Sequence, residues 1–216
     1  MVTNLDDFIL NIIKVSFDTL IPKRYATFVK MFYFNETEPS QKETFLKNMT
    51  NLLSDTTFLL SGVYLEESAL ISSYKYSDYS YFFDYRGTFS KTSNVIGSNE
   101  NIGVTHGDEL TYLFPTSPIQ FDQRQLELSE SDERIIDIMV DLWTSFAETG
   151  TPSTKWFPDS NFWQPYKNSK EYLIVGNNSD TTLSRREHFS EERMEFWREL
   201  IIDQLYVGSM RAMTHG

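Results

Sequence analysis

Only two segments of the 216-residue chain have the pattern of a buried β-strand, which limits what the chain can fold into. Residues 79–86 (YSYFFDYR) are short and dense in aromatic side chains, and residues 172–175 (YLIV) form a short apolar run before Gly176. A stable sheet needs about three or more strands. The pattern therefore predicts an α/β structure whose sheet is incomplete.

The other apolar residues recur mainly at helical spacing. The predicted helices cover residues 5–20, 40–53, 58–71, 129–150 and a last segment that begins at Ser190. We expect Pro22 to stop the first helix, and Ser54 with Asp55 to cap the third. Ser129 is expected to cap the fourth helix before Gly150 ends it. The order of helices and strands is typical of the α/β class.

Composition and charge argue against several classes of protein. Hydrophobic residues make up 40% and aromatic residues 15% of the chain, which is enough for a core and too much for a disordered tail. The formal net charge of −12, without a basic stripe, argues against binding to nucleic acid or anionic lipid. The absence of cysteine excludes disulfides, thiolate metal sites and cysteine nucleophiles.

Features of the sequence that bear on localisation point in different directions. No apolar run reaches the roughly 18–20 residues of a membrane-spanning helix, and the first residues do not have the pattern of a signal peptide. Three N-glycosylation sequons nevertheless begin at Asn35, Asn48 and Asn177. They favour a secreted or extracellular glycoprotein, although sequons also arise by chance.

Two groups of residues allow both a structural and a functional interpretation. The acidic group could bind a metal, but carboxylates in the first turn of a helix are favoured by its dipole, so we interpret it as capping. The aromatic group could line an acyl pocket, but alternation along a strand favours core packing. We predict no metal and no cofactor. The acidic group is Glu127, Glu130, Asp132 and Glu133, and the aromatic group is Tyr74, Tyr76, Tyr79, Tyr81, Phe82 and Phe83.

His106 is the candidate catalytic residue. It ends a polar connection, residues 87–107, that is longer than the roughly 12–15 residues usual inside a compact domain. A strand followed by a long loop that ends in histidine is how an α/β-hydrolase delivers its general base. Taken alone, a loop histidine is more often structural than catalytic. His188, beside charged residues, and His215, next to the C-terminus, are expected to be inert.

Residues 103–114 (GVTHGDELTYLF) resemble the histidine motif of the type-B carboxylesterases, the cholinesterase and juvenile-hormone-esterase group. Four further segments resemble the same family in the same order, namely residues 81–87, 142–152, 163–174 and 193–197. The resemblance implies an α/β-hydrolase fold and a serine esterase that cleaves small carboxylic esters through an acyl-enzyme. It also implies that His106 is the general base and that Asp108 and Glu109 orient its turn.

The chain departs from this family in its other catalytic motifs. The nucleophile elbow, Gly-x-Ser-x-Gly, is absent, and the only glycine pair at that spacing, Gly103 and Gly107, encloses Thr105. The Gly-rich oxyanion motif is also absent, and Asp6 and Asp7 fall too late to be the acidic triad member.

We therefore interpret residues 1–216 as a single C-terminal segment of a carboxylesterase-type α/β-hydrolase domain. This partial fold would pack helices on the last strands of a mostly parallel sheet, and the chain would be inactive alone. Two alternatives remain open: a non-catalytic, cholinesterase-like adhesion or binding module, and a truncated gene product that folds poorly.

Overall fold

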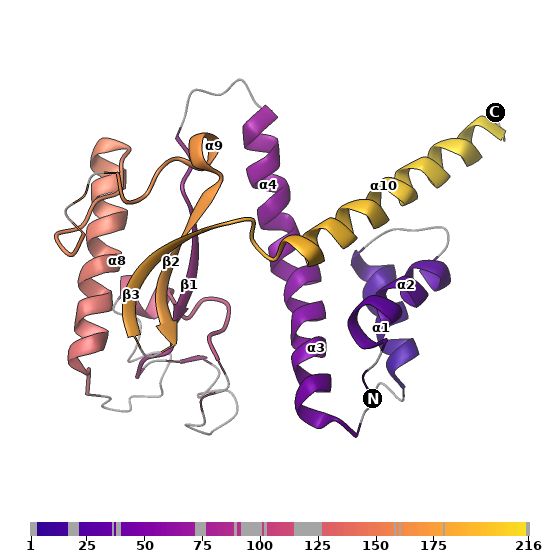
Figure 1. Ribbon diagram of the computed structural model, residues 1–216, viewed down its shortest axis with the longest axis horizontal. Helices are drawn as coiled ribbons and strands as arrows, with labels where there is room; N and C mark the ends of the chain where they lie inside the picture. Colours follow the sequence, from indigo (N-terminus) through magenta and orange to yellow (C-terminus); the bar gives the residue numbers. More distant parts are fainter. Residues whose placement is uncertain are drawn as a thin grey trace. The chain divides into compact units, whose positions relative to one another are not determined.

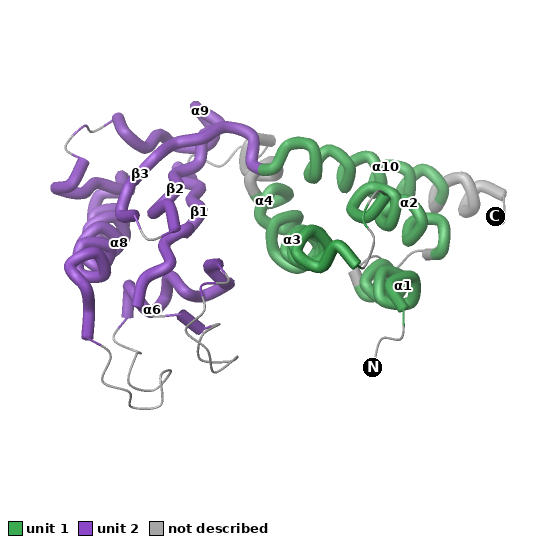
Figure 2. The backbone as a smooth tube through the Cα atoms, turned by 60° about the horizontal axis from the view of Figure 1, so that its bottom comes forward, with its two compact units in different colours: residues 1–71, 190–216 green, residues 72–189 purple. Residues whose placement is uncertain are grey.

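A computed structural model describes residues 4–16, 22–35, 37, 40–71, 77–88, 90–91, 101, 103–114, 127–157, 159, 161–178 and 180–214. The chain divides into two compact units, which Figure 2 distinguishes by colour. The helical unit joins residues 1–71 with residues 190–216, and the sheet unit comprises residues 72–189. The prediction that the chain is a single segment of a larger domain stays a prediction.

The helical unit is built from five α-helices and one π-helical segment among its described residues (Figure 1). They are α1 (Leu5–Ser16), α2 (Pro22–Phe34), α3 (Lys42–Ser54), the π-helical segment Asp55–Leu59, α4 (Leu60–Ile71) and α10 (Glu191–Thr214). The last helix begins one residue after the predicted Ser190. Helix α2 was not predicted. It begins at Pro22, because proline is well tolerated in the first turn of a helix.

The prediction that Ser54 and Asp55 cap a new helix is wrong. Ser54 and Asp55 both have helical backbone angles, so α3 continues through the π-helical segment into α4. Asp55 is fully buried, and its carboxylate accepts a hydrogen bond from Tyr33 Oη at 2.5 Å instead of capping a helix. The pattern of a cap was therefore produced by a residue that serves the core.

The core of the helical unit combines residues from both ends of the chain. Trp197 of α10 is fully buried and donates a hydrogen bond from Nε1 to Tyr33 Oη at 2.9 Å. The rings of Phe32 and Phe196 stack with centroids 4.1 Å apart. The fully buried members of this core include Ile9, Ile13, Tyr25, Val29, Leu52 and Trp197.

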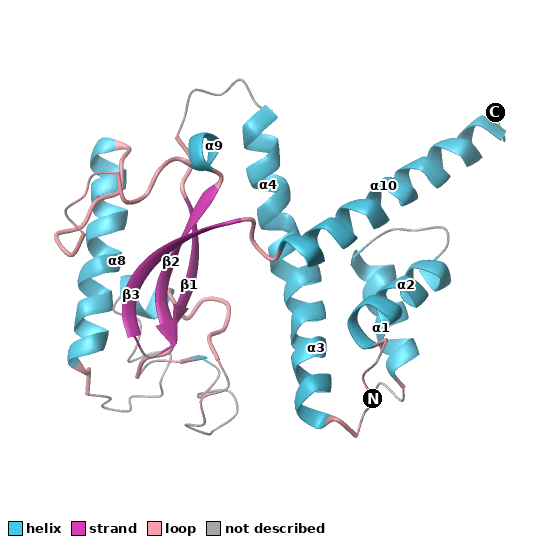
Figure 3. Cartoon of the chain, viewed as in Figure 1, coloured by secondary structure: helices cyan, strands magenta, loops and turns pink. Residues whose placement is uncertain are grey.

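The sheet unit contains three strands and three helices among its described residues (Figure 3). The elements are β1 (Ser80–Tyr85), α6 (Leu110–Leu113), α8 (Glu130–Thr149), α9 (Tyr166–Ser169), β2 (Glu171–Asn178) and β3 (Asp180–Glu187). The strand order is β1-β2-β3. Strands β1 and β2 are parallel, with Ser80 opposite Tyr172, whereas β2 and β3 form an antiparallel hairpin.

The prediction of only two strands is wrong, because the structure contains a third strand, β3, which pairs antiparallel with β2. This strand is mainly polar and charged, and only Thr181 and Leu183 are buried. Such a composition is common on an edge strand, where charged side chains discourage pairing with another chain. The strand therefore lacks the apolar run that would predict it.

Helix α8 has the predicted ends and the predicted apolar face. Ser129 caps it through a reciprocal capping box with Asp132, and Gly150 ends it in the left-handed conformation at φ 74°. The buried residues of α8 pack with Phe83 of β1 and Val175 of β2 in one core. The buried apolar residues among them are Ile135, Ile138, Met139 and Leu142, whereas Phe146 at the end of the same face is 42% exposed.

Gly176 explains why β2 continues beyond the predicted apolar run. The strand has a register shift between Val175 and Asn177, and Gly176 adopts φ 89° there. A Cβ atom on Gly176 would lie 2.6 Å from Cβ of Tyr85 and 2.8 Å from its Cα. Only glycine accepts both this backbone conformation and this close approach of β1.

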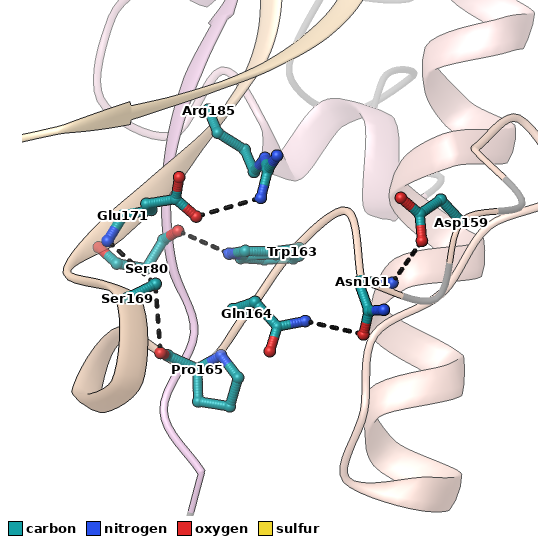
Figure 4. Close-up of polar contacts among 9 residues, drawn as sticks. All are labelled: Ser80, Asp159, Asn161, Trp163, Gln164, Pro165, Ser169, Glu171 and Arg185. Carbon is teal, nitrogen blue, oxygen red and sulfur yellow. Dashed lines mark hydrogen bonds and ion pairs between the residues drawn. The ribbon is translucent and has the colours of Figure 1, made fainter.

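The tryptophan- and proline-rich loop before β2 is attached to the sheet by polar contacts (Figure 4). Trp163 Nε1 donates to the carbonyl oxygen of Ser80 at 3.1 Å, which joins the loop to β1. Across the hairpin, Arg185 and Glu171 form an ion pair at 3.2 Å. The first contact joins the loop to β1, and the second joins β3 to the start of β2.

Candidate functional site

His106 lies in a tight turn between two glycines that have positive φ angles. Gly103 adopts φ 104° and Gly107 adopts φ 83°, conformations that strongly favour glycine. The turn is closed by a hydrogen bond from Asp108 N to the carbonyl oxygen of Thr105 at 3.0 Å. His106 itself is exposed, so its imidazole can be reached from solvent.

Asp108 organises this turn, in line with the role that the family resemblance implies for it. Its side chain is 1% exposed, and its two carboxylate oxygens accept backbone N–H groups from both sides of the connection. Lys91 N donates to Oδ1 at 2.8 Å, and Thr105 N donates to Oδ2 at 3.0 Å. The carboxylate therefore joins the outgoing and returning parts of the connection directly beside His106. Glu109, by contrast, makes no side-chain capping hydrogen bond at the start of α6.

A second buried carboxylate, that of Asp132, receives hydrogen bonds from four residues. Oδ1 accepts from Tyr85 Oη and Thr88 N, both at 3.0 Å, and from Tyr112 Oη at 3.4 Å. Oδ2 accepts from Thr88 Oγ1 and Ser129 Oγ, both at 2.6 Å, and from Ser129 N at 2.9 Å. The sequence predicts only the capping role of Asp132, because its contacts with β1 and α6 join residues far apart in the chain.

The electrostatics around Asp132 follow from burial and from these donors. Burial alone would raise the pKa of Asp132, but the hydrogen bonds from Ser129 and Thr88 outweigh it and lower the pKa. Burial raises the pKa of Tyr85 to about 12, and the nearby Asp132 charge acts in the same direction. At neutral pH the arrangement is thus an ionised carboxylate that accepts from neutral hydroxyl groups.

The aromatic residues of β1 divide between packing and a small pocket. Phe83 packs in the core against Tyr112, with ring centroids 5.6 Å apart, as predicted. Tyr79 and Tyr81, however, line a pocket of about 220 Å³ together with Trp163 and other residues. Tyr74 and Tyr76 of the same predicted group lie outside the described residues.

The remaining candidates are at the surface. Three members of the acidic group, Glu127, Glu130 and Glu133, are exposed. His188 is exposed as well and lies 3.7 Å from Glu187, while His215 is outside the described residues. In the described ranges, no three His, Cys, Asp or Glu side chains are grouped so as to hold a metal ion. The same ranges contain no helix that combines the length and apolar character needed to cross a membrane.

The three sequons differ in their surroundings. Asn35 follows the end of α2 and is exposed, and Asn177 is exposed near the end of β2. Asn48 lies inside α3, is only partly exposed, and donates a hydrogen bond from Nδ2 to Thr37 Oγ1 at 3.0 Å. In the folded chain, the amide nitrogen of Asn48 that would receive a glycan is therefore already hydrogen-bonded to Thr37.

Comparison with known proteins gives a consistent family. The chain is 29% identical to Esterase E4 of Myzus persicae over 153 residues, which are 66% of this chain and 26% of that protein. It is 26% identical to bile salt-activated lipase of Rattus norvegicus over 163 residues, 74% of this chain and 24% of the lipase. It is also 24% identical to Neuroligin-2 of Homo sapiens over 187 residues, 80% of this chain and 21% of that protein.

These matches cover most of the chain but only about a quarter of each relative. The sequence model of the carboxylesterase family matches residues 5–197, which include the whole sheet unit with the His106 turn and most of the helical unit. Membership of this family implies the α/β-hydrolase fold, and the mixed three-stranded sheet with its helices is compatible with part of that fold. The chain belongs to the carboxylesterase family.

Proposed function

We propose that this chain is the C-terminal segment of a serine carboxylesterase and supplies its general base, His106. The observation that carries the proposal is the match of the family over residues 5–197 together with the exposed imidazole at the end of the long connection. The substrate class is a small carboxylic ester. Exposure supports the role, because a general base must reach the proton that it removes.

The proposed chemistry is acyl transfer through a serine ester. The His106 imidazole takes the proton from the serine hydroxyl as its oxygen attacks the ester carbonyl, and then gives that proton to the leaving alcohol. The second half repeats these steps with water, which releases the acid and restores the serine. The serine, the acid that orients the imidazole and the oxyanion donors come from a segment outside these 216 residues.

The chain alone should therefore not hydrolyse esters. Removing the nucleophile from such a triad costs on the order of 10⁶-fold in kcat, and the triad members act as a unit. We expect the isolated chain to hydrolyse 4-nitrophenyl acetate no faster than an equal concentration of imidazole. Turnover above that background, lost in His106→Ala, would contradict this division of the catalytic groups.

The proposal is tested on the longest reading frame that contains this chain. We expect an upstream Gly-x-Ser-x-Gly motif, and we expect the encoded protein to hydrolyse 4-nitrophenyl acetate and to react with a fluorophosphonate. His106→Gln should lower kcat by on the order of 10⁴–10⁶-fold. His188→Gln, which changes another exposed histidine, is the matched control and should keep full activity. Activity that survives His106→Gln would refute the assignment.

A non-catalytic binding module is the second candidate function. It is favoured by the match to Neuroligin-2, whose name, unlike those of the other two relatives, denotes neither an esterase nor a lipase. An upstream motif in which another residue replaces the serine, with no reaction toward the fluorophosphonate, would favour this candidate.

A further inference from the structure

Asp132 receives more hydrogen bonds than the cap of a helix requires. A capping box needs only the reciprocal contacts between Ser129 and Asp132, and both are present in α8. The donors from Tyr85, Thr88 and Tyr112 add nothing to the cap, yet they converge on the same fully buried carboxylate. Their positions in the chain indicate what else the carboxylate does.

These additional donors lie at the two ends of the connection that carries His106. Tyr85 and Thr88 stand where β1 ends and the connection begins, whereas Tyr112 is in α6, directly after the His106 turn. Both ends are therefore held to one atom, Oδ1 of Asp132, at 3.0–3.4 Å.

The start of the connection is tightly packed against Asp132 and the two tyrosines. A Cβ atom on Gly87 would collide with Asp132 Oδ1, with Tyr112 Oη and with the ring of Tyr85. Tyr85 and Tyr112 also contact each other, with ring centroids 5.4 Å apart and nearly perpendicular rings. Asp132 belongs to α8, and this helix is anchored in the core by Ile135 and Ile138, which are fully buried on its next two turns.

We propose that Asp132 is a positioning residue for His106, which it serves by holding both ends of the connection to α8. The assignment of a base to be positioned rests on the proposed function, but the mechanical link does not. Asp108 joins the two parts of the connection to each other beside His106, and Asp132 joins both ends of the connection to the core. Asp132 touches no reacting atom in this role.

The link is tested on the full 216-residue chain by NMR and amide hydrogen exchange. Asp132→Ala removes the acceptor for Thr88 N and for two tyrosine hydroxyls, and losing bonds to a charged group of this kind changes an opening equilibrium by about tenfold or more. We therefore expect the amides of residues 103–112 to exchange about tenfold faster or more. The Cε1–H signal of His106, assigned by its absence in His106→Gln, should shift or broaden.

Two variants of the same helix separate positioning from general loss of stability. Ser129→Ala removes the hydroxyl that caps α8 but leaves Thr88 and Tyr112 bound to Asp132, so it should destabilise α8 without changing the His106 signal. Asp137→Ala removes an exposed carboxylate that pairs with Lys155 at 2.7 Å and should change neither. Tyr112→Phe keeps Asp132 and its cap, and should give a smaller change confined to residues 103–112.

The outcomes distinguish this inference from the proposed function. Equal effects of Asp132→Ala and Ser129→Ala on the His106 signal and on exchange would overturn the inference, as would an unchanged signal in both Asp132→Ala and Tyr112→Phe. If Asp132→Ala fails to fold, Tyr112→Phe alone decides. In the longer protein, ester hydrolysis that does not depend on His106 would refute the proposed function and leave the mechanical link in place.

Discussion

Adding a methyl group at Gly176 should weaken the sheet unit strongly, for two separable reasons. Gly176 has φ 89°, and a left-handed conformation costs an L-residue about 1–2 kcal/mol. The new Cβ would also lie 2.6–2.9 Å from backbone and Cβ atoms of Tyr85, which cannot rotate away. Overpacking of this kind costs about 1–3 kcal/mol. Gly176→Ala should therefore lower the free energy of unfolding by about 2–5 kcal/mol.

Urea unfolding followed by near-ultraviolet circular dichroism measures this effect, because Tyr85 lies in the aromatic core of the sheet unit. With an m-value of about 2 kcal/mol/M, the loss corresponds to a decrease in the midpoint of about 1–2.5 M urea. A midpoint that moves by less than about 0.5 M would refute the reasoning.

Two other glycines serve as controls for the two contributions. Gly150 has φ 74° but no heavy atom within 4 Å of an added Cβ, so Gly150→Ala should cost only about 1–2 kcal/mol. Gly62 lies inside α4 with an equally open surrounding and no positive φ, so Gly62→Ala should stabilise the helical unit by up to about 1 kcal/mol. Equal losses in Gly176→Ala and Gly150→Ala would mean that the close approach of Tyr85 contributes nothing.

Three further predictions concern charge and modification. Arg193 lies 3.5 Å from the buried Oδ1 of Asp55, so Arg193→Ala should cost about 3 kcal/mol or more at neutral pH, and adding Asp55→Asn should restore much of this loss in thermal unfolding. Burial raises the pKa of Asp55 despite Tyr33 and Arg193, so the stability due to Asp55 is complete below about pH 4 and is lost as pH rises through the raised pKa. Asp132 shows the opposite pH dependence. The stability that its carboxylate contributes is present above about pH 4 and is lost as pH falls through its lowered pKa. As the pH rises from about 3 to about 7, the unfolding free energy of the wild type should fall relative to that of Asp55→Asn and rise relative to that of Asp132→Asn. In secretory expression, mass spectrometry should find glycan on the exposed Asn177 and none on Asn48, whose amide nitrogen binds Thr37; glycan on Asn48 alone would contradict this.

The fold was predictable where a single periodicity determines an element. The apolar face of α8, its Ser129 cap and its Gly150 end could all be read from local spacing, and the structure confirms them. Strand β3 could not, because its polar residues conceal the two side chains that it buries. Helix α2 was not predicted although Tyr25, Val29 and Tyr33 stand at helical spacing and are buried. The cap predicted at Asp55 is wrong for a related reason, since its carboxylate accepts a hydrogen bond from Tyr33, 22 residues away, and not from its neighbours.

The candidate site was predictable only at the level of its turn. The glycines around His106 form a local motif that indicates the turn, and the family resemblance implies that the nearby Asp108 orients it. The contacts of Asp132 with Thr88 and Tyr112 span 44 and 20 residues, respectively, and no local pattern encodes them. The capping contact could be predicted because it joins residues three positions apart. That contact alone accounts for an aspartate at this position, so the sequence does not indicate the longer-range hydrogen bonds of the same side chain.

The helical unit closes around side chains from both ends of the chain, and this has a consequence during synthesis. Val29 and Leu52 share a core with Trp197 and Leu200, but the ribosome makes the whole of residues 72–189 between them. The contiguous sheet unit can fold while translation continues, since domains generally fold as units during synthesis. The first four helices must instead keep apolar faces exposed until α10 emerges, so a ribosome that stops before Glu191 releases a chain that chaperones and proteases will recognise.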